Sequence, residues 1–138
     1  MREIKFRAWD NVKKEMYFVG EEDDVVFSIE RFGTITATDI SEHDWGYPKL
    51  EHLQYMQSTG LKDKEDKEIY EKDIVYFNDF AYDRTGGHVD DNILKGEVEF
   101  SCGSWTIVTE KGIFELYNAI VNDQELEIIG NAYQGVKS

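Results

Sequence analysis

The chain has 138 residues, of which 15 are basic and 29 acidic, so its formal net charge is −14. Aromatic residues make up 14% of the sequence, which is typical of a folded protein and excludes a largely disordered one. Its single cysteine, Cys102, cannot form an internal disulfide, and no apolar run reaches the length of a membrane span. We therefore expect one domain in the cytoplasm, without membrane contact.

The charge is distributed unevenly along the chain. Residues 1–14 carry five basic and two acidic side chains, a net charge of +3, whereas the other 124 residues carry 10 and 27, a net charge of −17. This excess of acid argues against direct nucleic-acid binding, which needs cations to displace phosphate counterions. The simplest explanation is a soluble, self-repelling surface. Alternatively, the basic segment meets an acidic surface in the same chain or in another copy, which allows a homo-oligomer.

The first third of the chain alternates apolar and polar residues. This pattern predicts a half-buried strand at 3–9 and a returning strand at 16–19. A second hairpin is expected from the β-branched runs 25–29 and 34–38, which flank Arg31-Phe32-Gly33. The next segment, 39–52, has no clear period and predicts a loop.

The middle of the chain is expected to contain short strands between polar turns. Leu53–Gln57 reads as a strand that ends at a Ser58–Gly60 turn, and the charged residues 62–72 predict an exposed turn. Ile74–Phe77 is an apolar strand. The polar residues 78–95 form an eighteen-residue loop, longer than most loops, which makes them a candidate functional insertion.

The last part of the chain predicts a hairpin at 96–109 with its turn at 101–103. Residues 113–121 are interpreted as a short helix, although they could begin as a strand. The last strand, 125–129, is expected to stop at Gly130-Asn131.

These elements predict a mainly-β fold with at most one or two short helices. Their density after residue 73 favours a small, strongly bent, SH3-like barrel over residues 58–138, because curling removes most open strand edges. The N-terminal hairpins, 1–57, are expected to pack on it.

Several stretches of this sequence, taken together, form the pattern of a known protein family. They are the opening Met1–Asp10, the run Leu53–Asp63, the segment Lys67–Glu71 followed by Asp73–Val75, the strand Gly96–Val98, Trp105, and the closing Ile128–Tyr133. On these stretches the chain resembles the YopX family of phage and prophage proteins. The resemblance implies a phage or prophage gene expressed in the bacterial cytoplasm, and it implies no activity.

The family motif is interpreted as structural, because turn residues recur for geometric reasons. The family usually has glycine where this chain has Lys72, so a positive φ there would be strained. The motif residues are Thr59, Gly60, Leu61, Asp63, Ile69, Tyr70, Glu71, Asp73, Gly130 and Asn131.

No residue pattern indicates a catalytic, cofactor or metal site. His43, His52 and His88 match no metal-ligand spacing, and Cys102 lies in a predicted turn without a basic neighbour. Gly86-Gly87 lacks the remainder of a nucleotide-binding loop.

The candidate interaction surface consists of Arg7, Trp9 and Trp45, since exposed aromatic and arginine side chains mark interfaces. Trp45 is the best exposed candidate because it lies in a polar loop, and Trp105 is expected in the core.

Three functions remain open. The first is a non-catalytic module that binds an unidentified host or phage protein and also self-associates. The second is an acidic nucleic-acid mimic that modulates a host nucleic-acid-binding protein. The third is an enzyme of unknown class, with its site built from the variable loops.

Overall fold

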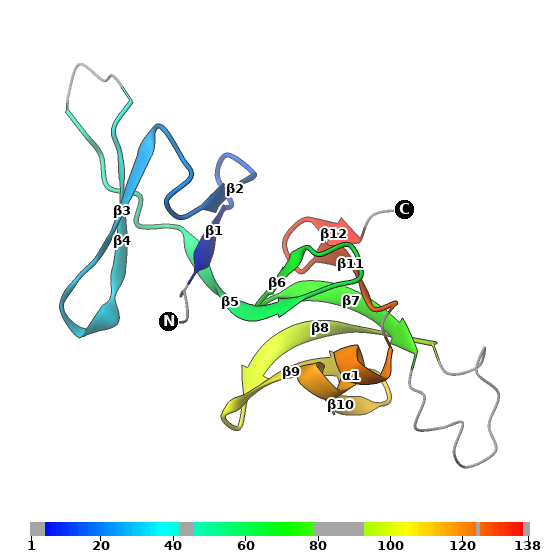
Figure 1. Cartoon of the computed structure of the whole chain (residues 1–138). Coiled ribbons are helices and arrows are strands. Elements are labelled where there is room, and N and C mark those ends of the chain that lie inside the picture. Colours follow the sequence, from blue (N-terminus) through cyan, green and yellow to red (C-terminus); the bar gives the residue numbers. More distant parts are fainter. Residues whose placement is uncertain (1–4, 42–45, 79–92, 124, 137–138) are drawn as a thin grey trace, which may run out of the picture. The chain divides into compact units, whose positions relative to one another are not determined.

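The computed structural model describes residues 5–41, 46–78, 93–123 and 125–136 (Figure 1). The chain divides into two compact units, an N-terminal unit, Lys5–Gln57, and a C-terminal unit that contains Ser58–Ser138. The mainly-β prediction is confirmed, since strands dominate both units and one α-helix occurs in these ranges.

Strand β1 (Phe6–Asp10) is the central strand of the N-terminal unit, because both of its edges are paired. β2 (Glu15–Phe18) returns antiparallel along one edge, and the first residues of β5 (Gln54–Lys62) pair along the other, from Phe6 opposite Gln57 to Trp9 opposite Gln54. The expectation of a half-buried strand is wrong, since the residues after Phe6 are buried on both faces.

The second hairpin lies where the β-branched runs predict it. β3 (Val25–Ile29) pairs antiparallel with β4 (Ile35–Asp39), and a short 3-10 turn, η1 (Arg31–Gly33), joins them. Apolar side chains from β1–β5 and from the segment before β5 form the core of this unit: Ala8, Tyr17, Val25, Ala37 and Leu53, with Phe27, Leu50 and Tyr55 packed against them.

A six-stranded antiparallel sheet forms most of the C-terminal unit, in the order β10-β9-β8-β7-β11-β12. It curls strongly into a half-barrel (Figure 1). Its strands are β7 (Asp73–Asn78), β8 (Ile93–Ser101), β9 (Ser104–Thr109), β10 (Gly112–Glu115), β11 (Glu127–Asn131) and β12 (Gly135–Val136). A further strand, β6 (Glu68–Tyr70), pairs with the second half of β5.

The one helix, α1 (Leu116–Asn122), follows β10 directly and lies beside β9 and β10 (Figure 1). Leu116 and Ala119, three residues apart, face the core, as a helical period requires. Full burial of a leucine side chain such as that of Leu116 stabilises a fold by roughly 1.5–3 kcal/mol. The core residues are Ile69, Val75, Phe77, Leu94, Val98, Ile107, Leu116, Ala119 and Leu126.

Three predicted boundaries are wrong. β5 continues through the expected Ser58–Gly60 turn, because Gly60 has φ +80° and the strand absorbs an irregularity between Ser58 and Lys62 instead of reversing. The expected turn at 62–72 contains β6. The last strand includes Gly130 and Asn131, because a bulge after Ile128 lets the pairing with β7 resume.

Candidate functional site

The turn of the β3–β4 hairpin presents a bulky aromatic side chain to solvent. Phe32 is 95% exposed and has φ +69°, in the left-handed region that aromatic residues rarely adopt. Backbone bonds define the turn, since Glu30 N–H donates to the Thr34 carbonyl (2.6 Å) and Gly33 N–H donates to the Glu30 carbonyl (3.1 Å). A non-glycine residue in this conformation is strained by about 1–3 kcal/mol.

The hairpin leading to this turn has one buried and one exposed set of apolar side chains. Phe27 packs edge-to-face on Tyr55, with ring centroids 6.4 Å apart, and Ala37 is buried in the core. Ile29 is 72% exposed and Val26 is also exposed. The hairpin is thus anchored at its base and presents apolar surface toward its turn.

An acidic hollow of about 300 Å³ lies near the other end of this hairpin. Tyr17 is part of its lining, and its hydroxyl donates a 2.9 Å bond to Asp10 Oδ2. The other lining residues are Lys13, Glu15, Glu21, Glu22, Asp23, Asp24, Val25, Asp39 and Ser41.

Asp10 is completely buried and accepts four hydrogen bonds. Its Oδ1 accepts from the Val12 and Lys13 amides and lies 2.8 Å from His52 Nε2. Burial alone would raise the pKa of Asp10, but the bonds from Lys13, Tyr17, His52 and Val12 outweigh it, so this pKa is lowered. Burial and the Asp10 carboxylate raise the pKa of Tyr17.

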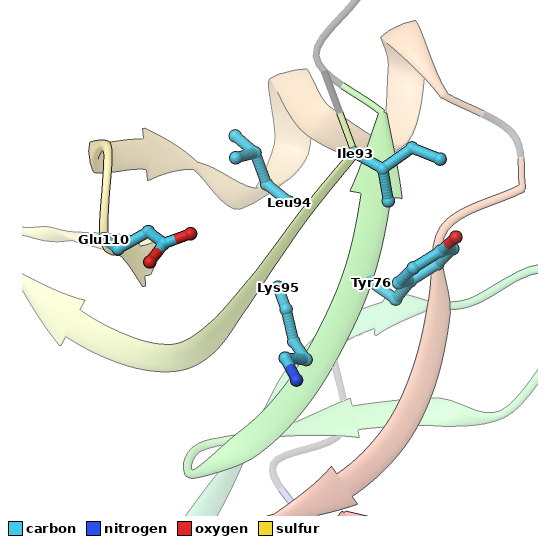
Figure 2. Close-up of a pocket in the computed structure, with 5 residues that line it drawn as sticks. All are labelled: Tyr76, Ile93, Leu94, Lys95 and Glu110. Atoms are coloured by element: carbon cyan, nitrogen blue, oxygen red, sulfur yellow. The ribbon is translucent and has the colours of Figure 1, made fainter. Parts of the chain in front are cut away.

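A second cavity, of about 450 Å³, lies on the C-terminal unit (Figure 2). The last pair between β8 and β9 joins Gly96 to Thr109, so Ile93–Lys95 extend beyond the end of β9. The cavity forms at this overhang, between the start of β8 and the turn after β9. Its lining residues are Tyr76, Ile93, Leu94, Lys95 and Glu110.

A charged cluster lies elsewhere on β8. Lys72 Nζ is 2.6 Å from Glu99 Oε1 and 3.5 Å from Glu97 Oε2. The hydrogen bond to Glu99 raises the pKa of Lys72 against the opposing effect of burial. A bond between the two glutamates raises the pKa of Glu97 and lowers that of Glu99. Lys72 has φ +72°, the positive value that the family's glycine suggested.

Polar residues of the family motif bind backbone groups. Thr59 Oγ1 donates to the Ile69 carbonyl, and Asp73 Oδ2 accepts from the Tyr70 amide. Asp63 accepts from the Glu65, Lys67 and Ile128 amides, so it joins the β5–β6 turn to β11. Asn131 Oδ1 accepts from the Tyr133 and Gln134 amides.

The remaining motif residues lie in the same unit. Gly60 and Leu61 are in β5, Ile69 is buried in β6, Glu71 lies between β6 and β7, and Gly130 is at the β11 bulge.

The predicted interaction surface needs correction. Arg7 and Trp9 are each only 6% exposed, because both faces of β1 are covered, and Arg7 Nε lies 3.4 Å from Met56 Sδ. Trp45 lies outside the described residues, as do His43, His88 and the glycines at 86–87. Trp105, expected in the core, is half-buried and stacks at a tilt on Phe100.

Sequence reasoning missed two features of the N-terminal unit, the exposed Phe32 and the buried Asp10–His52 contact. The signal for Phe32 was present, since a bulky aromatic residue occupied a turn position that favours glycine, asparagine or aspartate. The Asp10–His52 contact joins residues 42 apart in the sequence, and no local pattern indicates it.

Among the described residues, no three His, Cys, Asp or Glu side chains gather in a way that could hold a metal ion. Cys102 is exposed in the β8–β9 turn. No helix of the described chain is long and apolar enough to cross a membrane.

Solved structures similar to this chain are known. The crystal structure of protein yopX from Bacillus subtilis has a TM-score of 0.61 and 19% identity, with 95% of this chain and 94% of that one covered. Protein EF1440 from Enterococcus faecalis has a TM-score of 0.57 and 26% identity, with 96% and 95% covered. No curated protein matches the sequence.

The family model of the YopX protein matches residues 5–137 and so includes both units and the motif residues described above. The chain belongs to the YopX family.

Proposed function

We propose that the protein is a non-catalytic interaction module that contacts a partner protein through the turn of its β3–β4 hairpin. The observation that carries this proposal is Phe32, a fully exposed aromatic ring on a strained backbone. Strain of this kind concentrates at functional positions, and aromatic side chains, phenylalanine included, are enriched in the cores of protein interfaces.

The neighbours of Phe32 define the chemistry of the partner. Ile29 adds exposed apolar surface on β3, and Glu30 and Arg31 carry opposite charges beside the ring. A complementary partner presents an apolar recess flanked by one basic and one acidic group. The hairpin suits such contact because its base is held in the core while its turn remains accessible.

Site-specific photo-crosslinking tests this proposal. A photoreactive phenylalanine analogue replaces Phe32, and in a matched control it replaces Val12, an apolar residue that is 71% exposed on another turn. After irradiation of bacterial cells that express each variant, we expect protein adducts from position 32 and none from position 12. Equal adducts from both positions, or none from position 32, would contradict the proposal.

The acidic hollow supports a second candidate, a nucleic-acid mimic. Six carboxylates surround it: Glu15, Glu21, Glu22, Asp23, Asp24 and Asp39. With the net charge of −14, this surface could occupy a basic groove on a nucleic-acid-binding protein.

Competition distinguishes this candidate from the first. A mimic displaces a labelled DNA duplex from a basic bacterial nucleoid protein, and its affinity falls steeply with salt. A chain with Glu21, Asp23 and Asp24 neutralised should compete less well, whereas substitution of Phe32 should have no effect. Absence of competition at low salt eliminates the mimic.

A further inference from the structure

We infer that the partner of the hairpin turn is a second copy of this chain, whose β7–β8 cavity receives Phe32. This inference rests on the proposed function and identifies the partner. Two different surfaces of the molecule are involved, the turn Glu30–Gly33 of one copy and the cavity at the start of β8 in another.

The cavity has the size and lining that an aromatic turn needs. Its volume of about 450 Å³ is larger than one phenyl ring, which leaves room for the residues beside it. Tyr76 and Ile93 are both exposed apolar surfaces on its wall, and Figure 2 shows Tyr76 and Glu110 on opposite sides of the lining. Burying Phe32 against them would remove apolar surface of both copies from water.

The charges of the two surfaces are complementary. The turn carries Glu30 and Arg31, and the cavity wall carries Lys95 and Glu110. Among the described residues, Arg31, Lys95 and Glu110 form no ion pair within the chain. In the proposed contact, Arg31 lies opposite Glu110 and Glu30 lies opposite Lys95, so each charged side chain gains a partner of opposite charge. Such pairs fix orientation more than they add affinity.

The edge of β8 that faces away from β7 also supports the proposed contact. In the described part of the chain, Ile93–Lys95 pair with β7 on one side and have no strand on the other, because β9 ends opposite Gly96. An open strand edge is a place where another chain can add backbone hydrogen bonds.

This contact is heterologous, since the turn and the cavity are different surfaces. In a dimer, one copy still has a free cavity and the other still has a free turn. Further copies can therefore bind, and association continues to a ring or a linear assembly. A contact built on a single turn is small compared with a standard interface, and we expect association that depends on protein concentration.

Sedimentation velocity on mixtures of complementary variants provides the test. Phe32→Asp removes the aromatic ring from the turn and keeps the cavity, whereas Ile93→Asp places a charge on the cavity wall and keeps the turn intact. We expect the wild type to form species larger than a dimer as concentration rises, and each variant alone to remain monomeric. An equimolar mixture should form dimers and nothing larger, because only one intact turn and one intact cavity can meet.

Two controls keep the test decisive. Val12→Asp should associate like the wild type. Glu110→Lys, in an exposed turn, is a second cavity variant in case Ile93→Asp perturbs β8. It should weaken association, as should Arg31→Glu, and the two substitutions in one chain should restore it. A monomeric wild type at every concentration, or a mixture that stays monomeric, overturns the inference. A crosslink from position 32 to a different protein would then leave the proposed function intact.

Discussion

Asp10 is the buried residue on which most of the local structure of the first hairpin depends. Its carboxylate accepts from the Val12 and Lys13 amides, from Tyr17 and from His52. Asp10→Asn keeps the shape but offers one acceptor oxygen instead of two, so at least one donor loses its partner. We expect the free energy of unfolding to fall by about 2 kcal/mol, measured by urea denaturation at pH 7. An unchanged midpoint would contradict this.

Asp10 also makes the stability of the fold depend on pH. The pKa of Asp10 lies below its ordinary value of 3.8 in the folded protein, so its carboxylate stabilises the fold above that pH. This contribution is lost as pH falls through the folded pKa. The stability difference between wild type and Asp10→Asn should therefore shrink from pH 5 downwards, a range in which carboxylates titrate. A difference that stays constant or widens would rule out this account.

Lys72 combines a strained backbone with a favourable ion pair, and two substitutions separate these effects. Lys72→Met removes the contacts to Glu97 and Glu99 but keeps a side chain at φ +72°. Lys72→Gly removes the contacts and relieves the strain. We expect the glycine variant to be more stable than the methionine variant by about 1 kcal/mol in chemical denaturation. A methionine variant of equal or greater stability would show that the turn is unstrained.

Single residues differed in how well the sequence predicted them. The lysine in place of a family glycine indicated the positive φ at position 72 correctly. Arg7 and Trp9 look like surface residues because they alternate with apolar ones, yet both are buried, since both faces of β1 are covered. Alternation identifies a strand but does not reveal what covers each face.

At the scale of elements, the bulge in β11 depends on the absence of a side chain at Gly130. A Cβ added there would lie 2.1 Å from the Gly135 carbonyl oxygen and 2.7 Å from Val136 Cα, both of which are backbone atoms. Gly130→Ala must therefore push β12 away. We expect a loss of more than about 2 kcal/mol in the free energy of unfolding.

Gly20→Ala is the matched control for that substitution. Unlike Gly130, Gly20 has a positive φ, +92°, and a Cβ added to it would have no atom within 4 Å. Its cost should be the conformational one alone, about 1 kcal/mol. A loss for Gly130→Ala no larger than that for Gly20→Ala would contradict the large cost expected from the close approach of β12 to β11.

Strands and helices could be predicted from the sequence where the spacing and type of their side chains determine the secondary structure. The runs 25–29 and 34–38 gave a hairpin whose observed strands differ by one residue at most, because β-branched side chains favour a pleated surface. The segment 113–121 was ambiguous for a physical reason, since it is a strand up to Glu115 and a helix from Leu116. Gly60 was misread because a positive φ serves a bulge as readily as a turn.

For the whole molecule, density of short strands was enough to predict a mainly-β fold with a strongly curled sheet. The two proposed docking surfaces were beyond such reasoning. β9 ends opposite Gly96, three residues after the start of β8, so the cavity there depends on strand register, which composition does not encode. Phe32 and this cavity are also far apart in the sequence, so no local pattern relates them.

The net charge of the whole chain affects its thermal stability. With 29 acidic against 15 basic residues, the folded protein repels itself, and dissolved salt screens this repulsion. Salt also weakens surface pairs such as Lys72–Glu99, but exposed pairs contribute at most about 1 kcal/mol each. We therefore expect thermal stability to rise as sodium chloride increases, by about 3 °C for each kcal/mol of relieved repulsion.

A variant with fewer charges shows whether repulsion is the cause. Glu21→Gln, Asp23→Asn and Asp24→Asn together change the net charge from −14 to −11 in an exposed loop. This variant should melt higher than the wild type at low salt and gain less from added salt, because less repulsion remains to be screened. Differential scanning calorimetry over a salt series measures both effects. If salt lowers both melting temperatures, ion pairing outweighs repulsion. If the two proteins respond identically, repulsion by these three carboxylates is not the cause of the salt effect.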